Sequence, residues 1–119
     1  MKLFRIDGSL IIDKPEIDNL KELVEYCVRE GISLHHSDLQ YANMQGANMR
    51  GADMQDANMC HADLRGANIR DANLQRVFLR GADLRGADLR DADLRSADMR
   101  YANMQGANML GANIRDADF

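Results

Sequence analysis

The residues with the most evident chemical potential are the Asp and Asn side chains at every fifth position from Asp38 to Asp118, with Phe78 as the one exception. Carboxylates can act as general acids and bases, but catalysis requires that they converge on one reacting group. A period of five distributes them around the whole segment instead of gathering them in a cleft. Their oxygens can also accept backbone N–H groups in turns and form ladders between stacked coils. We therefore interpret these side chains as structural.

Soft metal ligands and catalytic motifs are scarce. Cys60 and His61 form the one adjacent pair of soft ligands, and His35 and His36 lie well before them in the chain. A structural metal site needs about four ligands at set distances, and the sequence contains no such set. No phosphate-binding loop, dinucleotide fingerprint or Ser/His/Asp pattern is present. We expect no metal, no cofactor, no catalytic residue and no enzymatic activity.

The elements that carry these side chains follow from the repeat itself. Every fifth residue from Leu39 to Phe119 is Leu, Met, Ile or Phe, and the residue two before it is Ala except at Ser37 and Val77. A period of five gives no apolar face on an α-helix and alternates between the faces of a continuous strand. The chain must therefore turn once per unit. The inward side chains are then the Ala and the Leu or Met, whereas Asp or Asn points outward and the next two residues form the corner.

The corner residues indicate how many units complete one coil. Four of the corner glycines are spaced by twenty residues, and three of the arginines keep the same spacing: Gly46, Gly66, Gly86 and Gly106, with Arg50, Arg70 and Arg90. Twenty residues correspond to four units, so the sequence predicts a square coil. Each coil then contacts only its neighbours in the stack.

Residues 37–119 resemble the pentapeptide repeat family through this Ala-Asp/Asn-Leu/Met-x-x unit. The resemblance implies an all-β solenoid, a right-handed quadrilateral β-helix, here of about four coils over residues 32–119. Every Met except Met1 occupies the inward position that the family usually fills with Leu or Phe. Because Met is adaptable, we expect a softer core than one of Leu.

Residues 1–31 differ in kind and predict an N-terminal cap. Leu3 to Ile12 has the pattern of a β-hairpin that turns at Asp7-Gly8. A helix is expected over about residues 16–30, with Asp18 as a candidate N-cap and Gly31 at its end. Its apolar stripe would cover the exposed end of the first coil, as terminal caps do in repeat proteins.

Composition limits the cellular context. A length of 119 residues predicts one domain, and the net charge of −4 is shared about equally by the cap and the repeat segment. No apolar run is long enough for a membrane span, and the charged N-terminus does not resemble a signal peptide. Cys27 and Cys60 have no disulfide-framework spacing, which favours the cytoplasm.

The one break in the repeat suggests a candidate partner surface. Val77 enlarges the inward position, and Phe78 should point outward between Asn58 and Asp98. The aromatic and basic residues assigned to the same quarter of the coil have the composition of protein-interaction hot spots. The candidate surface consists of Phe78, Tyr41, His61, Arg80, Arg100 and Tyr101.

Two functions are compatible with these residues. The first is a non-catalytic protein-binding module whose protein partner is unidentified. The alternative, implied by the family resemblance, is a DNA mimic that inhibits a DNA-handling enzyme, such as DNA gyrase, another topoisomerase or a defence nuclease. The four sides carry net charges of about −1, 0, 0 and −1, far below the one charge per about 1.7 Å of duplex DNA. Direct nucleic-acid binding is not expected, because no extended basic stripe is present.

Family resemblance also implies pairing through C-terminal ends, and we expect a weak end-to-end homodimer. The inward positions of the last coil would form that contact: Met104, Met109, Ile114 and Phe119. A square end face offers roughly 300 Å² per partner, against about 800 Å² for a standard interface. Affinity in the micromolar range is therefore more plausible than an obligate dimer.

Overall fold

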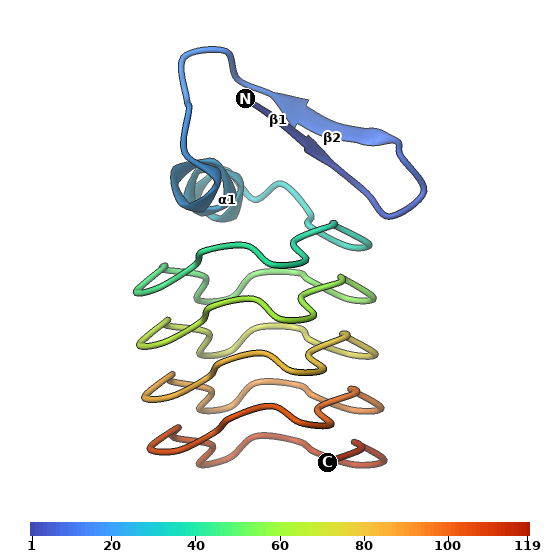
Figure 1. The fold of residues 1–119 in the computed structure, drawn as a ribbon, viewed down its shortest axis with the longest axis vertical. Coiled ribbons are helices and arrows are strands. Elements are labelled where there is room, and N and C mark those ends of the chain that lie inside the picture. Colours follow the sequence, from blue (N-terminus) through green and yellow to red (C-terminus); the bar gives the residue numbers. More distant parts are fainter.

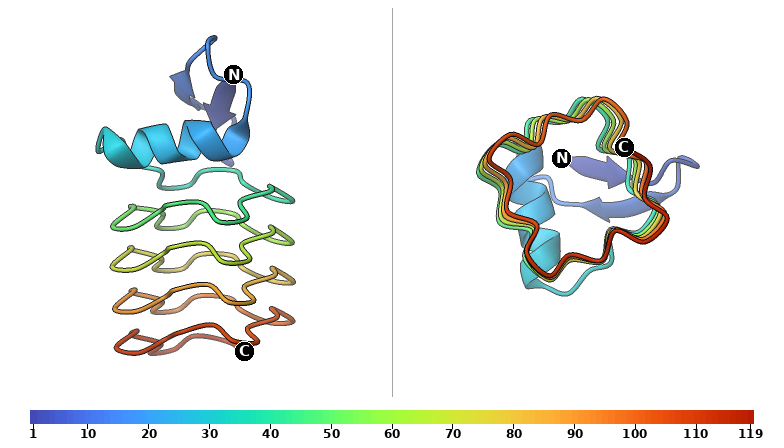
Figure 2. Two further views of the ribbon diagram at one scale, coloured as in Figure 1. Left: turned by 90° about the vertical axis from the view of Figure 1, so that its left-hand side faces the viewer. Right: turned by 90° about the horizontal axis from the view of Figure 1, so that it is seen from below.

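A computed structural model describes the whole chain, residues 1–119. Parallel β-bridges join residues twenty positions apart, from Asp38 with Asn58 to Asp98 with Asp118, and the coils stack in one column (Figure 1). Viewed along the column, successive coils superpose as a four-cornered outline (Figure 2). The predicted solenoid is confirmed. The bridges stay isolated because the chain turns after each short extended segment.

Each corner is made by one residue in the left-handed backbone region. Positive φ recurs at every fifth residue from His36 to Asp116. Gly46 adopts it without strain, but the same conformation occurs at Tyr41 with φ 62° and at Arg76 with φ 55°. The inward Ala after the corner donates its N–H to the carbonyl three residues earlier, as from Ala47 to Met44 at 3.0 Å. This turn fixes the position of every outward side chain.

The column interior is filled as the spacing predicts. Leu64 and Leu84 are fully buried, and the inward alanines between them are buried as well. Backbone hydrogen bonds connect the coils, as from the Leu64 N–H to the Asp83 carbonyl at 2.8 Å. Because each coil is bonded to the next, the stack forms a rigid support for its outward side chains.

The cap contains the helix α1, Leu20–Arg29, which lies across the first coil (Figure 2). The prediction of a helix over residues 16–30 is therefore too long at its start, and Asn19 rather than Asp18 is the N-cap, because its side chain accepts the Glu22 N–H. Gly31 ends the helix with φ 68°, and its N–H donates to the Val28 carbonyl. The helix is too short to span a membrane.

A hairpin completes the cap. Its strands are β1, Lys2–Phe4, and β2, Leu10–Asp13, which pair antiparallel with an irregularity after Leu3. The connection is longer than the predicted two-residue turn: Gly8 has φ 86° and the Arg5 N–H donates to the Ser9 carbonyl. This is the pattern of a three-residue loop with a glycine bulge.

The cap also bonds the upper edge of the first coil. The Phe4 carbonyl accepts the Asp38 N–H at 2.9 Å, and the Ile6 N–H donates to the His36 carbonyl at 2.7 Å. A carboxylate oxygen of Glu25 on α1 accepts the Asn48 N–H at 2.9 Å. These bonds cover a strand edge that would otherwise be open to association.

Candidate protein-binding surface

The outward residues of one side of the column include the break in the repeat. We call this side the Phe78 face; consecutive bridges stack its residues in the order Asp38, Asn58, Phe78, Asp98 and Asp118. Phe78 lies between Asn58 and Asp98, as the period predicts, and its side chain is 43% exposed. Val77 beside it is fully buried. Because Val77 is anchored in the core, the Phe78 ring next to it is held facing solvent.

The corner that follows this face carries a column of rings. We call it the aromatic edge and define it as Tyr41, His61, Gly81 and Tyr101. Tyr41 stacks on His61 with ring centroids 5.2 Å apart and planes 9° apart. The His61 ring fills the space above Gly81, because its Nδ1 would lie 2.5 Å from a Cβ built there. Tyr41 and Tyr101 are 70% and 80% exposed, so much ring area is open to a partner.

Two arginines flank the aromatic edge, and they differ in their contacts. The Arg80 guanidinium lies 5.3 Å from the centroid of the Tyr101 ring. Arg100 instead forms an ion pair with Asp98, with Nη2 and Oδ2 2.7 Å apart. Arg80 thus contacts one ring of the aromatic edge, whereas Arg100 is occupied by its own unit.

Phe78 belongs to a different part of the surface from that expected. It makes no ring contact with the aromatic edge and lines a hollow of about 450 Å³ beneath the hairpin loop. The hollow is lined by Arg5, Ile6, Asp7, His35, His36, Asp56 and Phe78. The candidate surface therefore has two parts, one at each margin of the Phe78 face. The sequence could not separate them, because position 78 lies midway between two corners.

Exposed apolar residues of the hairpin were missed by the sequence analysis. Phe4 and Leu10 are cross-strand partners and are 43% and 49% exposed. Ile6, also 49% exposed, lines the same hollow as Phe78. Strand alternation was the signal that could have found Phe4, because Leu3 before it is buried.

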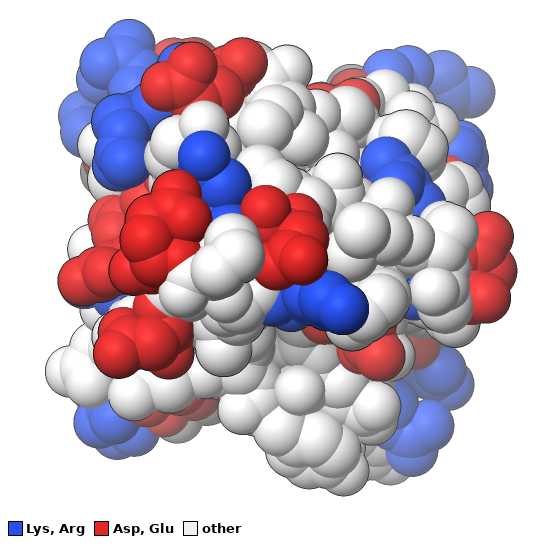
Figure 3. All heavy atoms as spheres, turned by 90° about the horizontal axis from the view of Figure 1, so that it is seen from above, with Lys and Arg blue, Asp and Glu red and all other residues white.

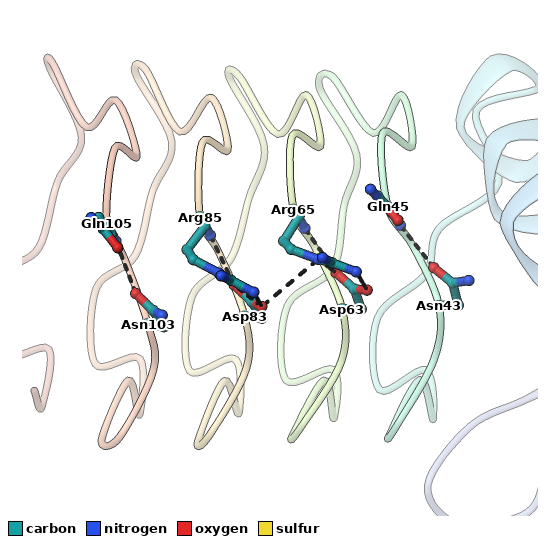
Figure 4. Close-up of polar contacts among 8 residues, drawn as sticks. All are labelled: Asn43, Gln45, Asp63, Arg65, Asp83, Arg85, Asn103 and Gln105. Carbon is teal, nitrogen blue, oxygen red and sulfur yellow. Dashed lines mark hydrogen bonds and ion pairs between the residues drawn. The ribbon is translucent and has the colours of Figure 1, made fainter.

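The side of the column that follows the aromatic edge is entirely polar. We call it the polar face; it carries Asn43, Asp63, Asp83 and Asn103 with the corner residues Gln45, Arg65, Arg85 and Gln105 (Figure 4). Each of its Asp or Asn oxygens accepts the N–H two residues later, as from Arg65 to Asp63 at 3.2 Å. These bonds confirm a structural role for the outward Asp and Asn.

Each Asp-x-Arg unit neutralises itself. Arg85 donates through Nε and Nη2 to the two carboxylate oxygens of Asp83, at 2.8 and 2.6 Å. The same fork joins Asp63 with Arg65, Asp88 with Arg90, Asp93 with Arg95 and Asp98 with Arg100. The hydrogen bonds from arginine lower the pKa of Asp83, Asp88 and Asp98 to about 2 in each case. Each fork places a guanidinium beside one of these carboxylates, so the ionised aspartates contribute little to the electrostatic field around the protein.

Charges on the capped end are likewise mixed. Viewed from above, acidic and basic side chains lie side by side (Figure 3). Lys14 pairs with Glu16 at 3.2 Å and lies over the Tyr26 ring. This end of the molecule carries no large area of one sign.

One cluster contains the residue types of a serine hydrolase. Ser33 Oγ lies 2.7 Å from His35 Nδ1 and 2.8 Å from Asp53 Oδ2. In a hydrolytic triad the histidine lies between the serine and the carboxylate, but here the serine lies between the other two. Asp53 therefore cannot orient His35 as a base, and the bonds connect the first coil to the next. The structure contains no group of three or more His, Cys, Asp or Glu that could hold a metal ion.

The residues of the candidate dimer end lie on the rim opposite the cap. Met104 and Met109 are half-buried, whereas Ile114 and Phe119 are 46% and 60% exposed. The rim is therefore partly apolar. It adjoins the Phe78 face at Asp118, which directly precedes Phe119.

Comparison with known proteins identifies the family. The family "Pentapeptide repeats (8 copies)" matches residues 30–66, 62–100 and 92–119. HetL, a pentapeptide repeat protein involved in heterocyst differentiation regulation from Nostoc sp. PCC 7120, is similar at 43% identity with a TM-score of 0.67, over 68% of this chain but 38% of HetL. The pentapeptide repeat protein alr5209 from Nostoc PCC 7120 is 37% identical with a TM-score of 0.67, over 86% of this chain and 79% of alr5209.

A third solved structure shares the fold. QnrB1, a plasmid-mediated fluoroquinolone resistance protein, is 21% identical with a TM-score of 0.63, over 67% of this chain and 45% of QnrB1. No curated protein matches significantly. The repeat unit, the coil of twenty residues and these matches lead to one conclusion: the chain belongs to the pentapeptide repeat family.

Proposed function

We propose that this protein is a non-catalytic protein-binding module that contacts a protein partner through the two margins of the Phe78 face. The scaffold would be a right-handed quadrilateral β-helix of about four coils, working in the cytoplasm. The observation that carries the proposal is the uneven distribution of exposed rings. Phe78, Tyr41 and Tyr101 all belong to the Phe78 face and its following corner, whereas the polar face carries only polar side chains, and its two arginines are paired with the aspartates of their own units.

Physical reasons favour binding at such a surface. Tyr and Arg are enriched among the residues that dominate protein interfaces. Tyrosine contributes a large contact area at a small cost in side-chain entropy. The coils beneath are joined by backbone hydrogen bonds, so little ordering is required when a partner binds. The relationship to HetL, a protein involved in regulation, is compatible with a binding role.

Affinity capture from the host lysate with quantitative mass spectrometry tests the proposal. The bait proteins are the parent, a Tyr41→Ala/Tyr101→Ala variant and a matched Gln45→Ala/Gln105→Ala variant on the polar face. We expect a partner that is retained by the parent and the polar-face variant and lost from the tyrosine variant. Equal capture by all three bait proteins would refute the assignment to the aromatic edge.

A DNA-mimic inhibitor is the second candidate, and the net charge of −4 is the observation in its favour. The forks weigh against it, because they place a guanidinium beside five of the outward carboxylates. A mimic should inhibit gyrase supercoiling or compete with duplex DNA for a nuclease, and the effect should weaken as salt rises. Absence of inhibition at low salt would leave the protein-binding module as the function.

The proposal includes a weak homodimer through the rim that carries Ile114 and Phe119, both of which are exposed. Sedimentation over a concentration series should show association of the parent in the micromolar range and none for Met109→Lys. A parent that stays monomeric at high micromolar concentration would exclude this contact.

A further inference from the structure

Arg80 is the one arginine of the repeat segment that forms no ion pair. The other nine each have a carboxylate partner: Arg50, Arg65, Arg70, Arg76, Arg85, Arg90, Arg95, Arg100 and Arg115. Arg80 is exposed, and its side chain makes no hydrogen bond within the protein. Its charge is therefore available to another molecule.

The cause is the residue two positions earlier. In the Asp-x-Arg units the carboxylate accepts both the arginine N–H and its guanidinium, as Asp98 does from Arg100 at 3.2 and 2.9 Å. Phe78 occupies the position of that carboxylate, so both acceptors are missing for Arg80. Asp98 in the next coil does not replace them: its two oxygens are bound by Arg100, and it forms no ion pair with Arg80. Phe78, in a position that otherwise holds Asp or Asn, thus exposes an aromatic ring and leaves the Arg80 guanidinium without a carboxylate partner.

Arg80 is nevertheless held in place. Its guanidinium lies 5.3 Å from the centroid of the Tyr101 ring, a distance at which the ring quadrupole attracts a cation. A guanidinium resting on a ring keeps the N–H groups at its margin available for a planar acceptor, and carboxylate is the acceptor that this fork fits in two-point contact. Tyr41 stacked on His61 continues the aromatic surface along the same corner.

We propose that Arg80 binds a side-chain carboxylate of an acidic segment in the protein partner, with an apolar neighbour of that carboxylate packed against the rings beside it. This inference rests on the proposed function and specifies its partner. Charge complementarity carries it, because Arg80 is the unpaired cation beside exposed rings. A polyanion such as nucleic acid fits less well, since Asp38, Asp98 and Asp118 lie on the same face and would repel its further charges.

Selection of random twelve-residue peptides displayed on phage, with the intact protein as target, tests the inference. Displayed peptides are joined to the phage at their C-termini, so side chains are their only carboxylates. We expect Asp or Glu to be enriched beside an apolar residue. A selected peptide, synthesised with an amidated C-terminus, should bind Arg80→Gln about tenfold more weakly than the parent.

Two further variants sharpen the result. Phe78→Asp keeps Arg80 but supplies the missing carboxylate, so it should weaken the acidic peptide as Arg80→Gln does. Arg80→Glu should reverse the selection toward Lys and Arg. Arg95→Gln is the matched control, because Arg95 is paired with Asp93 on another side of the column, and it should change affinity less than twofold. Thermal melts of all variants should resemble the parent, since these side chains are on the surface.

The outcomes separate the two proposals. Peptides that need Tyr41 and Tyr101 but show no preference for acids would refute the role of Arg80 and leave the binding module intact. Acidic peptides that bind Arg80→Gln as well as the parent would also refute it. Peptides that bind independently of the tyrosines, or no selected peptides at all, would count against both proposals. Preferential binding of a single-stranded oligonucleotide to the parent would replace the acidic segment with a nucleic acid.

Discussion

The polar face and the Phe78 face are built on the same backbone but treat their arginines differently. On the polar face Arg65 and Arg85 fold back onto the aspartates of their own units. On the Phe78 face Arg80 has no such aspartate and rests on Tyr101 instead. The comparison teaches that an outward aspartate holds the next arginine within its own unit, and that Phe78 in this position leaves Arg80 without that contact.

The largest expected effect tests whether the two faces share one core. Leu84 behind the polar face and Leu79 behind the Phe78 face are 0% and 1% exposed. Either Leu→Asp change would bury an unpaired charge and should cost about 4 kcal/mol or more of unfolding free energy. Chemical denaturation measures this loss. A large loss at one site alone would show that the faces are not equivalent supports.

Overpacking should have the next largest effect. Ala82 is 1% exposed behind the polar face, and Ala82→Leu should cost roughly 1–3 kcal/mol, since extra methylenes have no space in the packed coil. Ala102 lies one coil further along the same side and is only half-buried. Ala102→Leu is the matched control and should cost less. If urea denaturation shows a larger loss of stability for Ala102→Leu than for Ala82→Leu, the rim is packed more tightly than the half-buried Ala102 indicates.

The glycine corners distinguish the aromatic edge from the polar face. Gly81 and Gly86 have similar φ of 70° and 67°, so Ala at either should be strained, at a cost of about 1 kcal/mol. Only at Gly81 would the new Cβ also collide with the His61 ring. Gly81→Ala should therefore displace His61 from Tyr41, which changes in the ring-proton NMR shifts would report. Unchanged shifts would mean that the stack does not depend on the empty corner.

Phe78→Asp should make the Phe78 face resemble the polar face. The new carboxylate would accept the Arg80 N–H and guanidinium, as in the neighbouring units, and a ring 43% exposed loses little by removal. The net change in stability should stay within about 0.5 kcal/mol, because this is a surface site. Thermal denaturation checks it. A loss of several kcal/mol would show that the ring is structural.

The smallest effect concerns acid. The folded-state pKa of Asp83 is lowered to about 2 from an ordinary value of 3.8, chiefly by the hydrogen bonds from Arg85. The stabilisation is thus present above about pH 4 and is lost as the pH falls toward 2. Between about pH 4 and pH 2, the melting temperature of Asp83→Asn should therefore fall slightly less steeply than that of the parent. Asn103→Asp is the control, because it creates no fork when Gln105 follows it. Its melting temperature should depend on pH in this window much as that of the parent does.

Much of this architecture was determined by the sequence alone. The period of five excludes one continuous helix or strand, so the corners, the buried Ala and Leu or Met positions and the stack all follow from residue spacing. The outward position of Phe78 followed from the same count. These positions can be predicted from the sequence because each unit contains its own turn and contacts only adjacent coils.

The cap was predicted less accurately, because its boundaries depend on competition between similar signals. Pro15 and Asp18 favoured an earlier helix start, but Asn19 caps α1 because its side chain accepts the Glu22 N–H. Likewise, Asp7-Gly8 predicted a two-residue turn, but the hairpin has a three-residue loop. The hairpin also hydrogen-bonds to His36 and Asp38 of the first coil.

Side-chain partners were decided only by the tertiary structure. The sequence placed Arg80 and Arg100 in one patch with Phe78, yet Arg100 is bound by Asp98 whereas Arg80 rests on Tyr101. Phe78 faces a hollow beneath the hairpin rather than the tyrosines. The contacts of Arg80 and Phe78 depend on residues twenty or more positions away, brought within reach by the stacking of coils. A repeat fixes where each side chain starts, but its partner depends on which neighbours in the adjacent coils are still free to bind it.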